Sequence, residues 1–398
     1  MIPVAEALAR VLAVAAPRGS ETLPLLQAAG RVLATPLTAA HTHPPFDSSA
    51  MDGYAVRSED VEPGRPLRLI GTSQAGARFV GMMGPGHCVR IFTGAPMPIG
   101  ADAVIMQEEA RANGTEITFA TRPAPGQSVR MRGNDFKQGD VLLPAGSTLT
   151  PAALNLAASA NQPKVTVTRR PRIAVLSTGD ELVPPGSRIG PDEIVGSNSF
   201  GLIPLLSPFA AEIVDLGIVP DDKAKLDAAL LSALDAGVDV IVSTGGASVG
   251  DHDHMRDVLL NLGVTLDFWK LAMRPGKPLM FGTRGKTLIF GLPGNPVSAM
   301  VTAVVVVLPA LRAILGHADP LPPNLVLPLA APLPANGSRT HFLRANLDRR
   351  PDGTRVLPIL QTDSAHSSSL ALADGLIVQP ADDPGRNAGD LVEFLPLV

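Results

Sequence analysis

The sequence predicts a multidomain protein of α/β and β parts, with a central three-layer α/β/α domain built on a parallel sheet. The chain has 398 residues, and single hydrophobic cores stop growing at about 250–300 residues. Between about 170 and 318, uniformly apolar strand patterns alternate with helical patterns, which is typical of a parallel sheet covered on both faces. Before and after this region, short apolar runs separated by glycine and proline indicate β structure.

The part before the central domain is expected to be mainly β structure between helices. Residues 4–14 have apolar side chains at helical spacing, and residues 30–40 are expected to form a helix and then an extended segment. From 54 to 150, the runs YAVR, LRLIG, CVRIFTG, AVIMQE, EITFA and DVLLPAG predict a small barrel or paired sheets. A helix is expected over 151–160, since Pro151 suits a first helical turn.

The central domain is expected to alternate buried strands with amphipathic helices. The strands are RIAVLST (172–178), VDVIVST (238–244) and TLIFG (287–291). KLDAALLSALDA (225–236) and HMRDVLLNLG (254–263) are the helices between them. After this domain, the runs LVLPLA, THFLRANL, TRVLPIL, GLIVQP and DLVEFLPLV predict a small C-terminal β domain.

One apolar stretch, residues 296–315, requires a choice between a membrane span and a buried helix. Pro309 and Arg312 interrupt it, and its unbroken part is shorter than the roughly 20 residues that a bilayer needs. A buried core helix is the better interpretation. The N-terminus carries Glu6 and no basic segment, so we expect no signal peptide and a cytoplasmic protein without membrane attachment.

Composition excludes several classes of function. The net charge is −4 and aromatic residues make up 4% of the chain, so neither a basic nucleic-acid surface nor a base-stacking platform is expected. Cys88 is the single cysteine, which rules out an intrachain disulfide and a cysteine-rich zinc site.

Three glycine-rich loops follow predicted strands of the central domain, at 177–182, 243–253 and 291–298. Ligands of open parallel sheets bind beyond the carboxyl ends of the strands. Glycine lets backbone N–H groups approach phosphate closely, and a helix start, as at Asn295 and Pro296, favours anions. The alternative is that the glycines only close tight turns. The residues we expect to contact a ligand here are Ser243, Gly245, Gly246, Ser248, Gly250, Pro293, Gly294, Asn295 and Pro296.

A basic segment lies between these loops, in an otherwise acidic protein. Lys270, Arg274 and Lys277 fall within eight residues. An arginine fork and a lysine point charge suit a tetrahedral oxyanion. The alternative is a solvated basic turn. Pro275 and Pro278 stiffen the loop, which favours a preorganised site.

Several carboxylates and polar side chains lie in loops. Phosphate chemistry usually requires a hard cation held by one or two carboxylates and by the phosphate itself. Asp251 and Asp253 are the best magnesium candidates from the residues alone, whereas Asp221 and Asp222 are equally explained as helix caps. Two interpretations stay open for other polar residues. His252 and His254 either bind a metal or lie at the surface, and Thr93, Ser364 and 367–369 either contact a ligand or form structural turns.

At these residues the sequence resembles the molybdopterin molybdenumtransferase family, the MoeA group that includes the E domain of gephyrin. The resemblance is carried by PPFDSSAMDGYAV (44–56), RIFTGAPMP (90–98), STGDEL, STGGASVGDHD, MRPGKP and GLPGNPVSAM, and it runs in order along the chain. It implies an L-shaped homodimer in which the central domain binds molybdopterin. The implied parts are an N-terminal helix (1–16), a linker subdomain (17–44 and 136–169), an inserted β domain (45–135), the α/β domain (170–318) and a β-barrel-like C-terminal domain (319–398).

The resemblance also implies the reaction. Adenylylated molybdopterin and molybdate react with the help of Mg²⁺, AMP leaves, and the dithiolene receives molybdenum. Family roles would make Asp52, Asp135, Glu181 and Asp253 catalytic, with the first two supplied by the second subunit. Magnesium would be bound by Asp253, Asp221 and Glu181. The substrate contacts would include Thr93, Lys270, Arg274, Gly276, Lys277, Pro278, Arg344 and Ser364.

This sequence departs from the family pattern at two places. Arg274 stands where many relatives have lysine, and 363–366 reads Asp-Ser-Ala-His in place of a Gly-Ser-Gly or Gly-Ser-His run. The resemblance also implies possible transient partners, either a molybdopterin adenylyltransferase or a molybdoenzyme chaperone. Two alternative functions are an adenylyltransferase, which would need only the central domain, and a non-catalytic scaffold such as gephyrin.

Overall fold

The computed structural model describes residues 1–246 and 254–397. The chain divides into two compact units, one of residues 1–21 and 166–398 and one of residues 22–165. The chain passes between them twice, and there β1 (Ser20–Pro24) pairs with β12 (Lys164–Thr168). The two units are described separately.

The larger unit contains the α/β domain around a six-stranded sheet. Its order is β16 (Glu212–Val219), β13 (Arg172–Thr178), β17 (Val240–Thr244), β21 (Thr287–Leu292), β20 (Pro278–Arg284) and β18 (Thr265–Lys270). The first four strands are parallel, and this is the parallel sheet that the sequence predicts. β20 is antiparallel to β21 and to β18. The reason is local: only a two-residue turn separates β20 from β21, too short for the crossover that a parallel pair needs.

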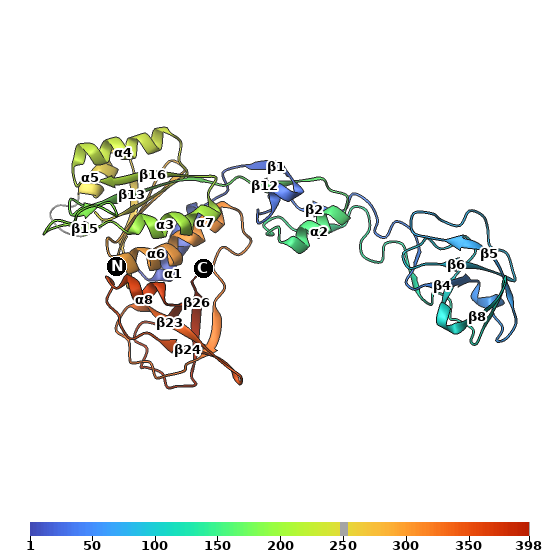
Figure 1. Cartoon of the computed structure of the whole chain (residues 1–398). Helices are drawn as coiled ribbons and strands as arrows, with labels where there is room; N and C mark the ends of the chain where they lie inside the picture. The colour runs from blue at the N-terminus through green and yellow to red at the C-terminus, as the bar shows by residue number, and fades with distance from the viewer. Residues whose placement is uncertain (247–253, 398) are drawn as a thin grey trace. The chain divides into compact units, whose positions relative to one another are not determined.

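Helices cover both faces of this sheet, which gives the predicted three layers (Figure 1). One face carries α4 (Lys223–Asp235) and α5 (His254–Asn261), packed over the core around Ala174, Leu176 and Ile241. The opposite face carries α1 (Val4–Val14), α3 (Asn198–Leu206) and the long helix formed by α6 (Pro296–Thr302), η5 (Ala303–Val307) and α7 (Leu308–Ile314).

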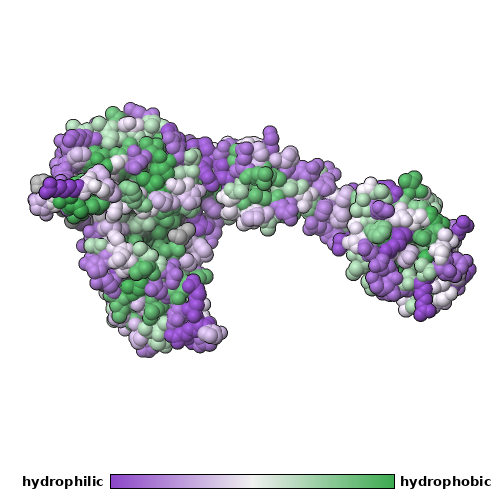
Figure 2. Space-filling model, in the orientation of Figure 1, coloured by the Kyte–Doolittle hydropathy of each residue, from purple (hydrophilic) through white to green (hydrophobic). Residues whose placement is uncertain are grey.

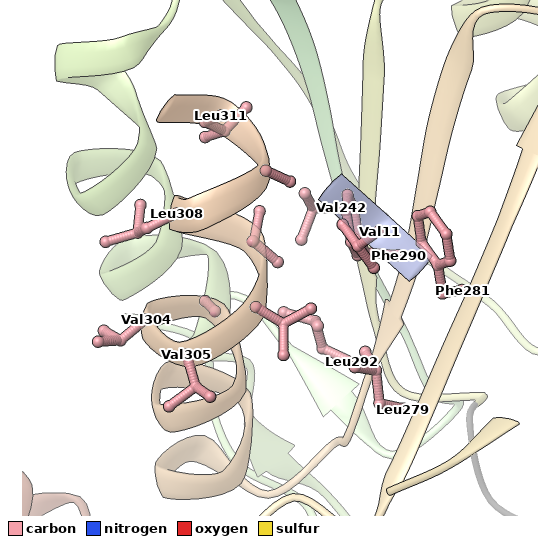
Figure 3. Close-up of a cluster of buried hydrophobic side chains, with 14 of the residues drawn as sticks. Val11, Val242, Leu279, Phe281, Phe290, Leu292, Val304, Val305, Leu308 and Leu311 are labelled. Carbon is pink, nitrogen blue, oxygen red and sulfur yellow. The ribbon is translucent and has the colours of Figure 1, made fainter. Parts of the chain in front are cut away.

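The long helix is the apolar stretch that the sequence assigns to the core. Residues Pro296–Ile314 have the length and mean hydropathy of a span, but 83% of the most apolar stretch is buried. Val304, Val305 and Leu308 belong to one buried hydrophobic cluster with the sheet residues Val242, Phe290 and Leu292 (Figure 3). η5 is a π-helical turn, which relieves the clash of the Pro309 ring with the preceding turn. The prediction of a buried core helix is confirmed.

The C-terminal β domain belongs to the same unit. Its strands run in the order β19 (Met273–Arg274), β23 (Thr340–Arg350), β25 (Gly375–Gln379), β26 (Leu391–Pro396) and β22 (Leu325–Pro328), and β24 (Gly353–Pro358) pairs with β23. Ala330 N donates to Val356 O at 2.7 Å, which joins the segment after β22 to β24. This contact closes the sheet, as the β-barrel-like prediction requires. Helix α8 (Ser367–Ala371) lies beside this sheet and contacts α6.

The face of this unit that carries α3 and α6 shows hydrophobic residues at its surface (Figure 2). A cavity of about 400 Å³ lies there, lined by side chains of α3, α6 and α8, among them Leu205, Met300 and Leu370. Ser197, Asn198 and Pro296 line this cavity and also a second cavity at the ends of the parallel strands.

The smaller unit contains one six-stranded sheet and shorter ladders. The sheet order is β7 (Ala103–Met106), β4 (Gly53–Val56), β6 (His87–Ile91), β5 (Leu67–Ser73), β9 (Glu116–Phe119) and β8 (Ala110–Asn113). The ladders are β3 (Ser48–Ser49) with β10 (Val129–Arg130) and β2 (Leu37–Thr38) with β11 (Val141–Leu143). Helix α2 (Pro151–Ser159) begins at Pro151 with Thr150 as its cap, as predicted.

The helix predicted within residues 30–40 is wrong. A 3₁₀ turn, η1 (Leu25–Ala28), ends before it. Gly30 has a positive φ of +70°. The backbone then pairs with residues 146–149, since Leu33 N donates to Ser147 O at 2.9 Å. Pro36 further excludes a helix at this position.

Candidate functional site

The glycine-rich loops of the α/β domain meet at one edge of its sheet. The chain runs from β13 to its neighbour β16 and then returns to β17 on the other side of β13. The strand order therefore reverses between β13 and β17. In open α/β sheets, ligands bind in the crevice at the carboxyl ends of two such strands.

Gly245, the first residue after β17, passes against the end of β13. Its φ is +84°, and a Cβ atom there would lie 2.1 Å from Thr178 O. Only glycine fits this approach. Packing thus explains Gly245, as the structural alternative expects, and the same approach leaves Gly245 lining two cavities.

The first of these, here called the strand-end cavity, has a volume of about 310 Å³. Of the predicted residues it contains Glu181, Gly245, Gly294, Asn295 and Pro296. Four more lining residues belong to the predicted glycine-rich loops, although they were not named as ligand contacts: Ser177, Thr178, Leu182 and Thr244. The lining residues outside the predicted loops are Ile194, Val195, Gly196, Ser197, Asn198 and Ala365.

Polar side chains that line this cavity form hydrogen bonds with one another and with the loop after β16. Thr178 Oγ1 donates to Asp221 Oδ1 at 2.5 Å, and Asp221 N donates to Asp180 Oδ1 at 3.0 Å. Thr244 Oγ1 donates to Ser177 Oγ at 3.1 Å. Asp222 instead caps α4, accepting from Lys225 N at 2.9 Å. The capping alternative is therefore correct for Asp222, whereas Asp221 faces the strand ends.

Asn198 connects the start of α3 to the third glycine loop. Its Nδ2 donates to Gly294 O at 2.7 Å. The sequence carries only a weak signal for this contact, a Gly-Ser-Asn run after the short strand β15 (Ile194–Val195). The contact fixes the carbonyl of Gly294, which lines both cavities.

The second cavity, here called the cation cavity, has a volume of about 640 Å³ and lies between the α/β and C-terminal β domains. It shares Gly245, Gly294 and Asn295 with the strand-end cavity. The structure brings together ten predicted residues here: Gly245, Gly246, Arg274, Gly276, Lys277, Pro278, Pro293, Gly294, Asn295 and Ser364. The lining residues that were not predicted are Pro275, Ser298, Arg339, Thr362 and Asp363.

The basic loop that lines the cation cavity is held at both ends. Leu271 N donates to Lys277 O at 2.9 Å. Gly276 has a φ of +102°, and a Cβ atom there would lie 2.4 Å from Thr302 Oγ1 of the long helix. The loop is thus fixed against the domain, which favours the preorganised site over a solvated turn. Lys270 is not among the residues that line the cavity.

The C-terminal β domain reaches the site through residues 362–364. Asn295 Nδ2 donates to Ser364 Oγ at 2.8 Å, and Val297 N donates to Ser364 O at 3.1 Å. Asn295 occupies the N-cap position of α6, but its side chain makes no cap hydrogen bond. The expectation that Asn295 acts as an N-cap is therefore wrong for the side chain, because the amide is bonded to Ser364 instead.

Arg344 is placed behind the cavity and does not line it. It is 3% exposed, and burial lowers the pKa of its guanidinium. Its donors reach Ser369 Oγ at 2.6 Å, Asp363 O at 3.1 Å and His366 O at 3.2 Å. Arg344 thus fixes the loop that carries Ser364, and Arg339 is the C-terminal-domain cation that lines the cavity.

Three further predicted residues belong to the smaller unit. Asp52 Oδ1 accepts from Thr93 N at 2.7 Å and from Thr93 Oγ1 at 2.8 Å. These two hydrogen bonds, the backbone one first, lower the pKa of Asp52. Asp135 lies on the turn before Phe136, with its N–H donating to His43 O at 3.2 Å.

The remaining predicted residues are placed as follows. Ser243 is buried on β17 and lines neither cavity. His254 begins α5 and is half-buried. Outside the described residues lie Ser248, Gly250, Asp251, His252 and Asp253.

Comparison with known proteins matches three consecutive regions of the chain to family models. Residues 2–161 match the MoeA N-terminal region (domain I and II). Residues 174–313, which carry the loops of both cavities, match a probable molybdopterin binding domain. Residues 326–397 match the MoeA C-terminal region (domain IV).

Named relatives cover most of the chain. A molybdopterin molybdenumtransferase of Haemophilus influenzae is 42% identical over 76% of this chain and 74% of its own. The Nostoc enzyme of that name is 37% identical over 95% of this chain and 89% of its own. A crystal structure of the molybdopterin biosynthesis MoeA protein from Pyrococcus horikoshii aligns over the whole of both chains, with a TM-score of 0.86 and 29% identity. The strand-end and cation cavities thus lie side by side in a chain whose relatives carry one name. By these similarities, the chain belongs to the molybdopterin molybdenumtransferase family, whose members are transferases of molybdenum cofactor biosynthesis.

Proposed function

We propose that the chain transfers molybdenum from molybdate to adenylylated molybdopterin in the cytoplasm, with release of AMP and with the help of Mg²⁺. One observation carries the proposal: the strand-end and cation cavities share Gly245, Gly294 and Asn295. Two ligands in these cavities would therefore be adjacent. Holding two reactants side by side removes much of the entropic barrier to their reaction.

The cation cavity suits molybdate, a tetrahedral dianion. Arg274 and Lys277 line it, and neither forms an ion pair with a carboxylate of the described chain. An arginine fork gives a geometry for two oxygens, and lysine adds a point charge. No protein ligand to molybdenum is needed in this proposal, since the dithiolene sulfurs of the second substrate become its ligands.

The strand-end cavity suits the phosphate-bearing substrate. It lies where the strand order reverses, and the hydroxyl-bearing residues Ser177, Thr178 and Thr244 line it. Thr178 and Thr244 donate their hydroxyl protons to Asp221 and Ser177, so the donors for phosphate oxygens would be backbone N–H groups and the Ser177 hydroxyl. We assign adenylylated molybdopterin to this cavity, with its dithiolene towards the shared residues.

The carboxylates near the strand ends fit a magnesium site completed by substrate. No cluster of three metal-ligating side chains occurs in 1–246 and 254–397. Mg²⁺ is usually bound by only one or two carboxylates together with substrate phosphates. Glu181 lines the strand-end cavity, Asp221 accepts a hydrogen bond from the lining residue Thr178, and the family resemblance adds Asp253. When bound, the ion would supply charge stabilisation at the phosphoanhydride.

We further propose that the enzyme acts as a homodimer whose second subunit contributes Asp52, Thr93 and Asp135. Thr93 holds the Asp52 carboxylate through two hydrogen bonds, so this group is fixed and ionised on the smaller unit. Mixing two inactive variants, Asp52→Asn and Lys277→Ala, tests the shared site. Heterodimers contain one site with neither substitution, so partial activity should return. Activity that stays absent although heterodimers form would contradict a shared site.

Incubating the purified protein with adenylylated molybdopterin, Mg²⁺ and molybdate tests the reaction itself. We expect AMP and molybdenum-bound cofactor to appear together, and neither to form when Mg²⁺ is removed by a chelator. ATP consumption with free molybdopterin would instead indicate an adenylyltransferase. An Asp253→Asn variant that remains fully active would refute the role given to Asp253.

A further inference from the structure

We propose that Thr178 is a positioning residue of the magnesium site. Its hydroxyl holds one oxygen of the Asp221 carboxylate, so that the other oxygen stays available to the cation. Thr178 is the last residue of β13 and lines the strand-end cavity. The inference rests on the proposed function, which gives Asp221 to Mg²⁺. It adds a residue that supports the metal ligand without touching the metal.

The loop at the end of β13 restrains both the side chain and the backbone of Asp221. Thr178 Oγ1 donates to Asp221 Oδ1 at 2.5 Å, and Asp221 N donates to Asp180 Oδ1 at 3.0 Å. The next residue, Asp222, is fixed as the N-cap of α4. A ligand that is restrained before the cation arrives loses less conformational freedom on binding. Asp221 is therefore preorganised on both sides.

The two carboxylate oxygens of Asp221 have different surroundings. Oδ1 accepts the hydroxyl proton of Thr178, whereas Oδ2 has no hydrogen-bond partner among residues 1–246 and 254–397. Carboxylates that bind a metal are themselves hydrogen-bonded, and these outer partners set their orientation. Mg²⁺ needs only one or two such carboxylates when substrate phosphates complete its shell. The pair of Thr178 and Asp221 has this arrangement.

The methyl group of Thr178 fixes the direction of its hydroxyl. The side chain is 3% exposed. Its Cγ2 atom lies 3.3 Å and 3.2 Å from the points where Gly245 and Gly246 would carry Cβ atoms. The glycine loop after β17 therefore passes over the methyl group. Since threonine is branched at Cβ, this contact restricts χ1 and with it the hydroxyl. Thr178 thus ties the loop after β17 to Asp221, which follows β16.

Mn²⁺ binding by full-length variants in the presence of AMP, followed by electron paramagnetic resonance, tests the inference. Thr178→Val keeps the shape of the side chain and removes the hydroxyl. Its Mn²⁺ affinity should fall about tenfold to a hundredfold, as is usual when the outer partner of a metal ligand is lost. Thr178→Ser returns the hydroxyl and should recover most of the affinity. Thr178→Ala gives the same comparison if the valine variant does not fold.

Thr287→Val is the matched control. Thr287 Oγ1 donates to Val238 O at 3.0 Å, at the opposite end of the same parallel sheet. This variant loses a hydroxyl hydrogen bond as Thr178→Val does, and it should bind Mn²⁺ as the wild type does. In the assay of AMP release, Thr178→Val should raise the Mg²⁺ concentration that gives half the maximal rate, with a smaller change in kcat. A purely structural role would lower the free energy of unfolding and leave this concentration unchanged.

The outcomes separate this inference from the function on which it rests. If the wild type with AMP binds no Mn²⁺, or if Asp221→Asn binds it as tightly as the wild type, the magnesium role given to Asp221 is wrong, and the role of Thr178 with it. If Asp221→Asn loses affinity while folded Thr178→Val binds Mn²⁺ as tightly as the wild type, the inference alone is wrong.

Discussion

Asn295 Nδ2 donates a hydrogen bond to Ser364 Oγ at 2.8 Å, and this bond joins the third glycine loop of the α/β domain to the C-terminal β domain. Both residues line the cation cavity. We predict that Asn295→Ala and Ser364→Ala each raise the KM for molybdate, because either loss frees the loop that closes the cavity. The double variant should be little worse than either single variant, since both remove one interaction. Fully additive effects in this double-mutant cycle would show that the two residues act independently.

Gly245→Ala is predicted to destabilise the α/β domain strongly. The new Cβ atom would lie 2.1 Å from Thr178 O, so the backbone must shift. Gly237→Ala is the matched control: its φ is +70°, but nothing lies within 4 Å of a Cβ atom there. The free energy of unfolding of the control should fall only by the cost of a left-handed alanine, about 1–2 kcal/mol. Urea unfolding of both variants measures the difference, and equal losses would contradict the packing described for Gly245.

Thr93→Val is predicted to raise the pKa of Asp52 while leaving it below the ordinary value. The substitution removes the side-chain hydrogen bond and keeps the backbone one, which is the larger cause of the lowered pKa. A ¹³C NMR titration of the carboxyl group measures it. Thr118→Val, in the same β domain, is the control and should not change it. An unchanged Asp52 pKa in Thr93→Val would exclude the Thr93 hydroxyl as a cause.

His341→Gln is predicted to make the folded chain lose less stability when the pH is lowered. The pKa of His341 is lowered from 6.5 to about 4 in the folded chain, so the unfolded chain binds more protons between these values. His341 therefore contributes stability that is present above pH 6.5 and falls as the pH drops towards 4, by up to about 3 kcal/mol. Urea unfolding at several pH values should show a flatter profile for the variant. A profile as steep as that of the wild type would contradict this role.

Much of the site could be predicted from sequence because its residues are grouped in short motifs. The segments MRPGKP and GLPGNP bring Arg274, Lys277 and Gly294 to one cavity, and the strand-end rule for parallel sheets explains why separate loops meet there. The buried helix at 296–314 followed from the position of Pro309 and its limited apolar length.

Other parts of the site depend on contacts that no local pattern records. Arg339 stands alone in a Ser-Arg-Thr run and reaches the cavity only because β23 pairs with β19. The hydrogen bond from Asn295 to Ser364 joins residues that are 69 positions apart in the chain. The position of Asn295 directly before Pro296 suggests a helix cap instead. The antiparallel β20, by contrast, has a local cause, the two-residue turn that leads directly into β21.

AMP release from adenylylated molybdopterin with and without molybdate, by the wild type and by an Arg274→Ala/Lys277→Ala double variant, tests directly whether the cation cavity binds molybdate. If the cation cavity binds the oxyanion beside the activated dithiolene, wild-type release depends on molybdate and yields equal amounts of AMP and molybdenum cofactor. The double variant should then lose this response at moderate molybdate concentration while remaining folded. A double variant that responds to molybdate as the wild type does would show that Arg274 and Lys277 do not bind the oxyanion.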